Sequence, residues 1–249
     1  MKWFSRIFVA AALMTLALSV NAQTRPVQKF GNVTITPIYH ATLLIQAGGK
    51  NIYVDPAKPA NFSGLPPADL ILITHDHGDH VDHDQTSIKA IAKPDTEIWA
   101  PAAVKEFVTQ ATVIANGDTK KWGKWTIEAI PAYNLVRGPS AGQFFHPKGR
   151  GNAYVLTYGG KRFFISGDTE ATPEIKALKN IDVAFICVNL PYTMPPDEAA
   201  EVVKEMHPKV VIPYHYRGMP ATDLNAFKTK LDGTKIDVRL LEWYPKAAS

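Results

Sequence analysis

The stretch Thr74-His75-Asp76-His77-Gly78-Asp79-His80 carries more information about this chain than any other. It directly follows the apolar run 70–73, Leu-Ile-Leu-Ile, which is typical of a buried strand. The ends of such strands are where open α/β sheets place their ligand sites. The stretch holds three imidazoles and two carboxylates, and nitrogen with some carboxylate oxygen is the donor set that zinc prefers. We therefore expect a metal site at this strand end.

Two later apolar runs also end in a polar side chain of the right type. Asp168 follows the run 163–165, and His215 follows the run 210–214. Separate strand ends that each deliver a metal-binding group are what a cleft between two sheets requires. Asp55 closes a further strand, and we expect its carboxylate to hold the loop 74–80 in place rather than to bind metal.

The two halves of the chain repeat one pattern. The hairpin-turn sequence Gly48-Gly49-Lys50 returns as Gly159-Gly160-Lys161, and Asp69, which precedes the first buried run, returns as Asp182. The spacing is nearly constant, which indicates a duplicated unit of the type ββ-α-β-α. Two such halves facing each other predict an α/β fold, a four-layer αββα sandwich, as a single domain over residues 23–249.

The motif His75-x-His77-x-Asp79-His80 resembles the H-x-H-x-D-H signature of the metallo-β-lactamase superfamily, in particular its lactonase-like and phospholipase-D-like branches. The resemblance implies the same αββα fold. It also implies a hydrolase that uses a water activated by metal, here two zinc ions. By the family pattern, His75 and His77 bind the first ion, and Asp79 and His80 bind the second.

Two more ligands follow from the same resemblance. Asp168, in Ser166-Gly167-Asp168-Thr169, corresponds to the aspartate that bridges both ions, and His215 corresponds to the last histidine, on the second ion. Either Asp79 or Asp168 is expected to act catalytically, by orienting the attacking water and accepting its proton.

One position departs from the family pattern. Asn134 stands where the third histidine of the first ion is usual, and an amide oxygen is a weak zinc ligand. Three arrangements remain open: Asn134 coordinates weakly, His146 of the following loop replaces it or contacts substrate, or the first ion is simply bound more weakly. His40 begins a strand whose sequence resembles the lactonase-like branch, and it either faces the cleft or is structural.

The substrate is expected to be a small molecule. Four cationic side chains lie near the proposed mouth and would suit an anionic ester, lactone or phosphodiester: Arg137, Lys148, Arg150 and Arg217. A β-lactamase and a metal-binding protein without turnover are the alternatives. The formal net charge of +4 is too small to indicate a nucleic-acid partner.

The first 22 residues have the features of a secretory signal peptide. Lys2 and Arg6 precede the apolar stretch 7–20, and Val20-Asn21-Ala22 is a small-x-small cleavage site. We therefore expect a periplasmic protein that begins at Gln23 and keeps no stable membrane anchor. The single cysteine, Cys187, lies in an apolar run, excludes an internal disulfide and is expected in the core.

Overall fold

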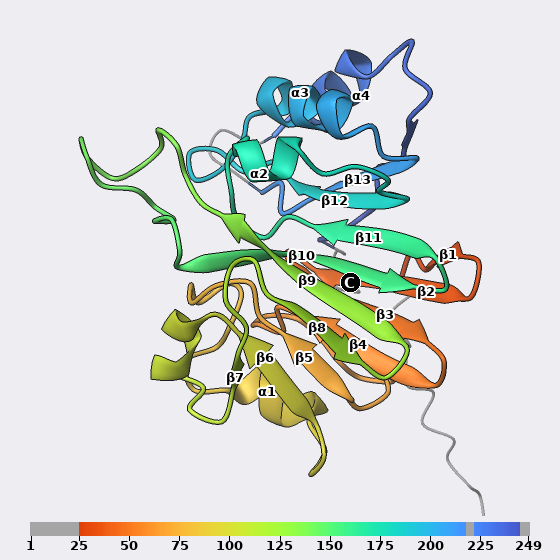
Figure 1. The fold of residues 1–249 in the computed structure, drawn as a ribbon, viewed down its shortest axis with the longest axis vertical. Helices are drawn as coiled ribbons and strands as arrows, with labels where there is room; N and C mark the ends of the chain where they lie inside the picture. Colours follow the sequence, from red (N-terminus) through yellow and green to blue (C-terminus); the bar gives the residue numbers. More distant parts are fainter. Residues whose placement is uncertain (1–24, 218–221, 245–249) are drawn as a thin grey trace, which may run out of the picture.

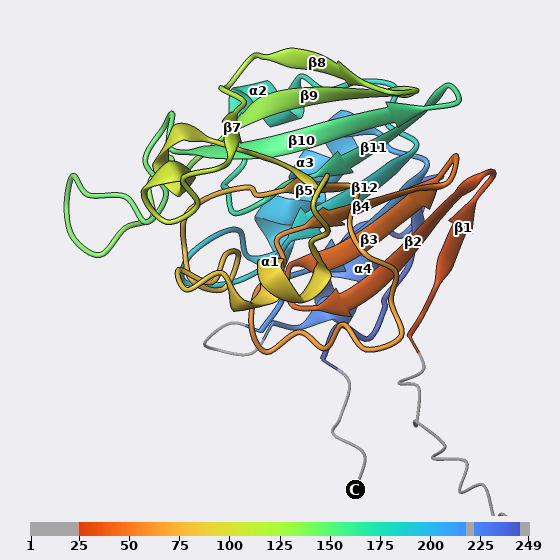
Figure 2. The same cartoon turned by 90° about the horizontal axis from the view of Figure 1, so that it is seen from below.

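A computed structural model describes residues 25–217 and 222–244. They form two seven-stranded sheets that pack face to face, with helices on the outer faces (Figures 1 and 2). The expected αββα sandwich of two halves is thereby confirmed. The expected signal peptide lies outside the described residues. No helix in the described part of the chain combines the length and the apolar character needed to cross a bilayer.

The first sheet has its strands in chain order. They are β1 (Gln28–Phe30), β2 (Val33–Tyr39), β3 (Thr42–Ala47), β4 (Lys50–Val54), β5 (Leu70–Leu72), β6 (Glu97–Ala100) and β7 (Thr112–Val113). Pairing is antiparallel from β1 to β4 and parallel from β4 to β7. Helix α1 (Thr86–Ile91) connects β5 to β6, and a short 3₁₀ helix, η1 (Ala102–Glu106), connects β6 to β7.

The second sheet repeats this order strand for strand. Its strands are β8 (Thr119–Trp122), β9 (Trp125–Ala132), β10 (Gly151–Tyr158), β11 (Lys161–Ile165), β12 (Val183–Cys187), β13 (Val210–Tyr214) and β14 (Asp237–Val238). Pairing changes from antiparallel to parallel at β11, as it does at β4 in the first sheet. Its helices are α2 (Pro173–Lys176), α3 (Pro196–Met206) and α4 (Leu224–Lys230).

Equivalent aspartates stabilise the same junction in each half. A carboxylate oxygen of Asp69 accepts a hydrogen bond from the backbone N–H of Asn51 at 2.9 Å, and one of Asp182 accepts from the N–H of Arg162 at 2.8 Å. The backbone N–H of each aspartate also donates to the carbonyl of the same partner. The repeat inferred from the sequence is therefore a repeat of local structure.

Strand alternation explains why the sheets form two cores. Leu43 and Ile45 of β3 point into the space between the sheets, whereas Leu44 points outward, toward the side covered by α1. The central strands β12 and β13 are buried on both faces, which matches their continuous apolar sequence. Cys187 lies in this core, as expected.

The connection between β6 and β7 contains only a short helical element. It is the 3₁₀ helix η1, which follows Pro101 and ends at Glu106. It has no side-chain cap, and Val104 is its only fully buried side chain, so neither capping nor packing favours a longer helix.

Candidate metal centre

The candidate ligands all lie in loops at one end of the sandwich. The loop after β5 carries residues 75–80, and the loops after β11 and β13 carry Asp168 and His215. The carboxyl ends of parallel strands meet at one edge of a sheet, so these loops come together between the two halves.

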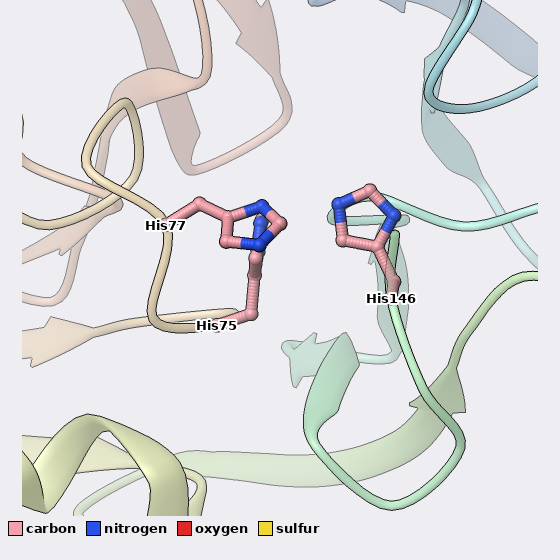
Figure 3. Close-up of side chains that lie close together, drawn as sticks. All are labelled: His75, His77 and His146. Carbon is pink, nitrogen blue, oxygen red and sulfur yellow. The ribbon is translucent and has the colours of Figure 1, made fainter. Parts of the chain in front are cut away.

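Three histidines form the first centre. One ring nitrogen each of His75, His77 and His146 lies within 4.8 Å of the other two. Figure 3 shows His75 and His77 on the loop after β5, and the ring of His146 facing them from the loop between β9 and β10. A triangle of imidazole nitrogens at this spacing fits one zinc ion.

Asn134 supports this centre from behind and is not among its metal-binding groups. Its Oδ1 accepts hydrogen bonds from the backbone N–H and from Nδ1 of His146, both at 2.7 Å. Its Nδ2 donates to Glu170 at 3.0 Å and to the carbonyl of Tyr192 at 2.8 Å. Because Nδ1 of His146 is held by the amide, Nε2 is the nitrogen free to face His75 and His77. Of the three arrangements that the sequence left open, this geometry favours the one in which His146 replaces Asn134, because the ring of His146 lies with His75 and His77 and Asn134 lies behind it.

Asp79, His80 and His215 form the second centre. Nε2 of His215 lies 3.1 Å from Nε2 of His80 and 3.3 Å from a carboxylate oxygen of Asp79. Nε2 of His80 lies 3.9 Å from the same oxygen of Asp79. Two imidazole nitrogens that face each other at this distance beside a carboxylate form a site for a cation.

Asp168 lies between the two centres. Its Oδ2 is 3.4 Å from Nε2 of His146, and its Oδ1 is 3.4 Å from Nε2 of both His80 and His215. Each carboxylate oxygen thus faces a different centre. The side chain is 4% exposed, so no bulk water competes for it.

Buried polar atoms without partners mark the same place. Nε2 of His75, Nε2 of His146 and Oδ1 of Asp168 are buried and have no hydrogen-bond partner among the described residues. Such atoms are costly unless a ligand satisfies them. Burial together with His80 holds the pKa of His75 well below its usual range, so this imidazole is neutral, as a metal ligand must be. The donor atoms present therefore fit two zinc ions.

Asp55 anchors the loop that carries the first ligands. Its buried carboxylate accepts hydrogen bonds from the backbone N–H of Thr74 at 2.7 Å and from the Thr74 hydroxyl at 2.8 Å, and it lies 2.7 Å from Nδ1 of His80. Burial opposes a charge on His80, but the carboxylates of Asp168, Asp55 and Asp79 hold its pKa well above the ordinary value. Asp55 thus fixes the ring orientation of His80, as the sequence led us to expect.

His40 faces the cleft beside the second centre. Its Nε2 is 3.0 Å from Asp79, its Nδ1 contacts the Tyr244 hydroxyl, and its ring centroid is 3.7 Å from that of His215. Burial and the neighbouring His215 lower the pKa of His40 to about 4, so the ring is neutral near pH 7. A neutral ring that donates from Nε2 to Asp79 accepts from Tyr244 at Nδ1.

Three of the four expected rim cations are paired with carboxylates. Arg137 contacts Glu170 and Glu198, Lys148 contacts Glu174, and Arg150 forms a two-pronged pair with Asp76. Only Arg217 lacks a carboxylate partner within the described ranges 25–217 and 222–244. It donates to the Tyr39 hydroxyl at 3.1 Å and lies over the Tyr244 ring.

Sequence reasoning missed two carboxylates that organise the site. Glu170 is 1% exposed and accepts hydrogen bonds from the backbone N–H groups of residues 135–137 as well as from Asn134. Asp76 ties the metal-binding loop to Arg150, just before β10. The sequence offered one signal for these two carboxylates, since Asp76 lies within the motif 75–80 and Glu170 lies two residues after Asp168. Their hydrogen-bond partners are distant in sequence and could not be inferred.

Two facing halves with histidines and aspartates gathered between their loops define the metallo-β-lactamase class of proteins. The family model for the beta-lactamase superfamily domain matches residues 34–215. A UPF0173 metal-dependent hydrolase of Ligilactobacillus salivarius is 33% identical over 201 residues, covering 76% of this chain and 88% of that protein. Another, of Thermodesulfovibrio yellowstonii, is 29% identical over 244 residues, covering 87% and 91%.

Solved structures agree with this result. The crystal structure of a protein described as a metal-dependent hydrolase from Parabacteroides distasonis superposes with a TM-score of 0.82 at 40% identity, covering 89% of this chain and all of that one. Igni18, a metallo hydrolase from Ignicoccus hospitalis, shares the fold with a TM-score of 0.70 at 22% identity, covering 84% and 95%. The chain belongs to the metallo-β-lactamase superfamily, among its metal-dependent hydrolases.

Proposed function

We propose that this chain is an exported hydrolase with two zinc ions, which cleaves a carboxylic ester, a lactone or a phosphodiester. The position of Asp168 is the observation that carries the proposal. Its Oδ2 faces His146, and its Oδ1 faces His80 and His215. A single carboxylate that reaches two ligand sets is the arrangement that a pair of ions requires.

The chain's own residues divide the work of hydrolysis. Zinc ions held here would supply a polarised substrate oxygen and an activated water. Asp79 is the carboxylate that reaches solvent, with 48% of its side chain exposed, and it is positioned to orient the attacking water and to accept its proton. His40 donates to Asp79 and is itself held by Tyr244, which fixes the direction in which the carboxylate points.

The pKa of Asp79 supports the first part of this role, the orientation of water. Burial alone would raise the pKa, but His80, His215 and His40 lower it far below its usual range. The carboxylate is therefore ionised near neutral pH and is able to accept a hydrogen bond from the attacking water.

Export rests on the sequence of residues 1–22 alone. Cleavage after Ala22 would leave Gln23 as the first residue. The intact mass of the protein recovered from the periplasm tests this directly. A mass that includes residues 1–22 would contradict export with cleavage.

The central experiment combines metal analysis with hydrolysis assays. The full chain is stripped of metal, reloaded with zinc, and assayed on γ-lactones, bis(p-nitrophenyl) phosphate, p-nitrophenyl esters and a chromogenic β-lactam. We expect about two zinc ions per chain and turnover of an ester, lactone or phosphodiester. Asp168→Asn should lose both zinc and turnover, whereas His207→Gln, on an exposed histidine bonded only to the Lys204 carbonyl, should keep both.

Three results would contradict the proposal. Full zinc content in Asp168→Asn would show that the carboxylate does not bridge two ions. Two bound ions without turnover of any substrate in the panel would favour a metal-binding protein without catalysis, and turnover of the β-lactam alone would favour a β-lactamase.

A further inference from the structure

The exposed apolar side chains of the described residues gather beside the first centre. Seven large apolar side chains are exposed among the described residues, and four of these seven belong to the loop between β9 and β10 or lie against it: Leu135, Val136, Phe144 and Tyr192. Val136 is the most exposed of all, at 76%. Exposed apolar side chains that cluster at one place mark a surface that binds something.

This cluster is continuous with the metal centre. Phe145 lines the small cavity that His75, His77 and His146 also line. Its ring packs edge-on against the ring of Tyr192, with 4.9 Å between the centroids. The carbonyl of Tyr192 in turn accepts the hydrogen bond from Asn134. An apolar surface thus extends from the first centre outward to solvent.

Backbone hydrogen bonds within the loop fix the position of these exposed side chains. The backbone N–H of Asn134 donates to the carbonyl of His146, and that of Phe145 donates to the carbonyl of Arg137, so the two sides of the loop pair with each other. At Gly138 an added Cβ would lie 1.6 Å from the carbonyl oxygen of Gln143, so only glycine permits this pairing. Figures 1 and 2 show the loop extending away from both sheets.

Glu170 also holds the backbone of this loop. It accepts hydrogen bonds from the backbone N–H groups of Leu135 and Val136, both at 2.9 Å. These bonds orient the backbone of both residues independently of what their side chains contact. The side chains therefore remain exposed without collapsing onto the core.

The cationic side chains near this apolar surface are neutralised by carboxylates. Arg137 and Lys148, which belong to the same loop, are paired with glutamates, as described above. A paired cation attracts an anionic substrate far less than a free one. The apolar side chains therefore set the chemistry of the surface.

We propose that these five residues, the apolar platform of Leu135, Val136, Phe144, Phe145 and Tyr192, bind an alkyl or aryl chain of the substrate, next to the bond that is cleaved. The inference rests on the proposed function, because it takes the metal centre as the place of cleavage. The substrate class is then an ester or lactone with an apolar chain. Continuity with the metal centre, through Phe145, favours the substrate itself as the occupant.

The test measures binding separately from turnover. Hydroxamates of two, four, six and eight carbons chelate zinc through the same head group, and their dissociation constants with the zinc-loaded protein are measured by calorimetry. Each methylene placed on the platform should tighten binding by about two- to fourfold, as expected for partial to full burial. Val136→Ser and Phe144→Ser should reduce this dependence on chain length. Leu240→Ser and Val113→Ser, on exposed apolar residues elsewhere, should leave it intact.

The outcomes separate the inference from the proposed function. Dissociation constants that do not change with chain length, or a dependence that survives both Val136→Ser and Phe144→Ser, would overturn the platform. So would a change of oligomeric state or of vesicle binding in these variants with no change in hydroxamate binding, which would assign the surface to a second copy or to a membrane. A dependence on chain length without hydrolysis of any ester, lactone or phosphodiester of the panel would contradict the proposed function and leave the platform standing. Failure to bind any hydroxamate would contradict both.

Discussion

The turn between β2 and β3 and the loop between β9 and β10 occupy equivalent positions in the two halves, and each brings one histidine to the metal site. The turn is only residues 40–41, and His40 lies beside Asp79 of the second centre. The loop spans residues 133–150, and His146 lies with the histidines of the first centre. The same place in the fold thus serves opposite centres by connections of very different length.

The difference in length changes how each histidine is held. His40 lies in a short turn, with a positive φ of 53°, and its ring nitrogens contact only its immediate surroundings, Tyr244 and Asp79. His146 lies far along a loop, and an amide and a buried glutamate, Asn134 and Glu170, must hold that loop. A long connection therefore needs a hydrogen-bonded frame of its own, and in return it has room for additional side chains near the site.

A second pair of equivalent positions has the same backbone in both halves and differs only in its side chains. Asp55 follows β4 and Ser166 follows β11, and the backbone N–H of each donates to the neighbouring parallel strand, to Leu72 and Phe185. Each side chain then accepts from the next strand end: Asp55 from the N–H of Thr74, and Ser166 from that of Cys187. The backbone is alike in both halves, but only Asp55 also contacts a metal-binding histidine.

The largest expected effect distinguishes the two histidine-bearing connections. His146→Ala removes a ligand and should lower the zinc content from about two ions to about one, with loss of most turnover. His40→Ala removes a group that holds Asp79 and should keep both ions while lowering turnover by about 10- to 100-fold. Zinc content and rate are measured on the same samples. Equal zinc content in both variants would show that the two histidines play the same part.

Next in size is the effect of changing the equivalent residues Asp55 and Ser166. Asp55→Ala leaves His80 and Thr74 without a buried partner and should destabilise the metal-free protein by about 3–5 kcal/mol. Ser166→Ala removes one neutral hydrogen bond and should cost about 1 kcal/mol. Urea denaturation followed by tryptophan fluorescence measures both. Similar costs would mean that the duplicated backbone, and not the charged contact, dominates.

Asn134 is expected to act on affinity more than on stability. Asn134→Ala should weaken the first zinc by about 10- to 100-fold, because His146 loses the acceptor that orients it. Asn134→Asp keeps an oxygen at that place and should recover most of the affinity. Titration with a fluorescent chelator should show two release steps, and only the earlier step should move. An Asn134→His variant that binds zinc more tightly would show instead that position 134 is itself a ligand position.

The smallest effect concerns the equivalent aspartates far from the metal. Burial would raise the pKa of Asp69, but hydrogen bonds from Lys93, the Asn51 N–H and Lys50 lower it, and Lys209 and the Arg162 N–H do the same for Asp182. A lowered pKa in the folded state adds stability above the ordinary carboxyl pKa, and that stability disappears as the pH falls through the lowered value.

Each aspartate should therefore contribute stability above the ordinary carboxyl pKa. Asp69→Asn and Asp182→Asn should each cost about 0.5–1.5 kcal/mol at pH 7, and the cost should shrink as the pH falls through and below the ordinary carboxyl range. Urea denaturation across this range measures the difference. A loss of unfolding free energy that persists in acid would show that the packing or hydrogen bonds of the new side chain, and not the missing charge, cause the effect.

The sequence predicted the parts of the molecule that depend on local patterns. The apolar runs, and the polar residues that follow them, predicted that the loop 75–80, Asp168 and His215 lie together, because the carboxyl ends of parallel strands meet at one edge of a sheet. The internal repeat and the family resemblance predicted the αββα sandwich, and the resemblance supplied the assignment of these residues to two ions. The role of Asn134 could not be decided, since whether a histidine 12 residues away replaces it depends on how the intervening loop folds back.

The rim cations show a second limit. Arg150 and Lys148 were expected to suit an anionic substrate, but both are paired with carboxylates, Asp76 and Glu174, which are distant in sequence and meet them only in the folded protein. Long-range ion pairs leave no trace in local composition. The exposed apolar side chains of the same loop became informative only once the core was known and they were seen to lie outside it.

The division of ligands between the two sheets has a thermodynamic consequence. Residues 75–80 belong to the first half, and Asp168 and His215 belong to the second, so neither centre is complete until the halves have docked. Zinc bound as proposed would therefore bind the native chain far better than the unfolded one, and its free concentration would enter the folding equilibrium by mass action. For a chain that holds two ions in this way, each tenfold rise in free zinc above the dissociation constant adds about 1.4 kcal/mol per ion to the free energy of unfolding. With the proposed occupancy by zinc, the stability of the fold would therefore depend in part on the zinc supply of the compartment in which the protein folds.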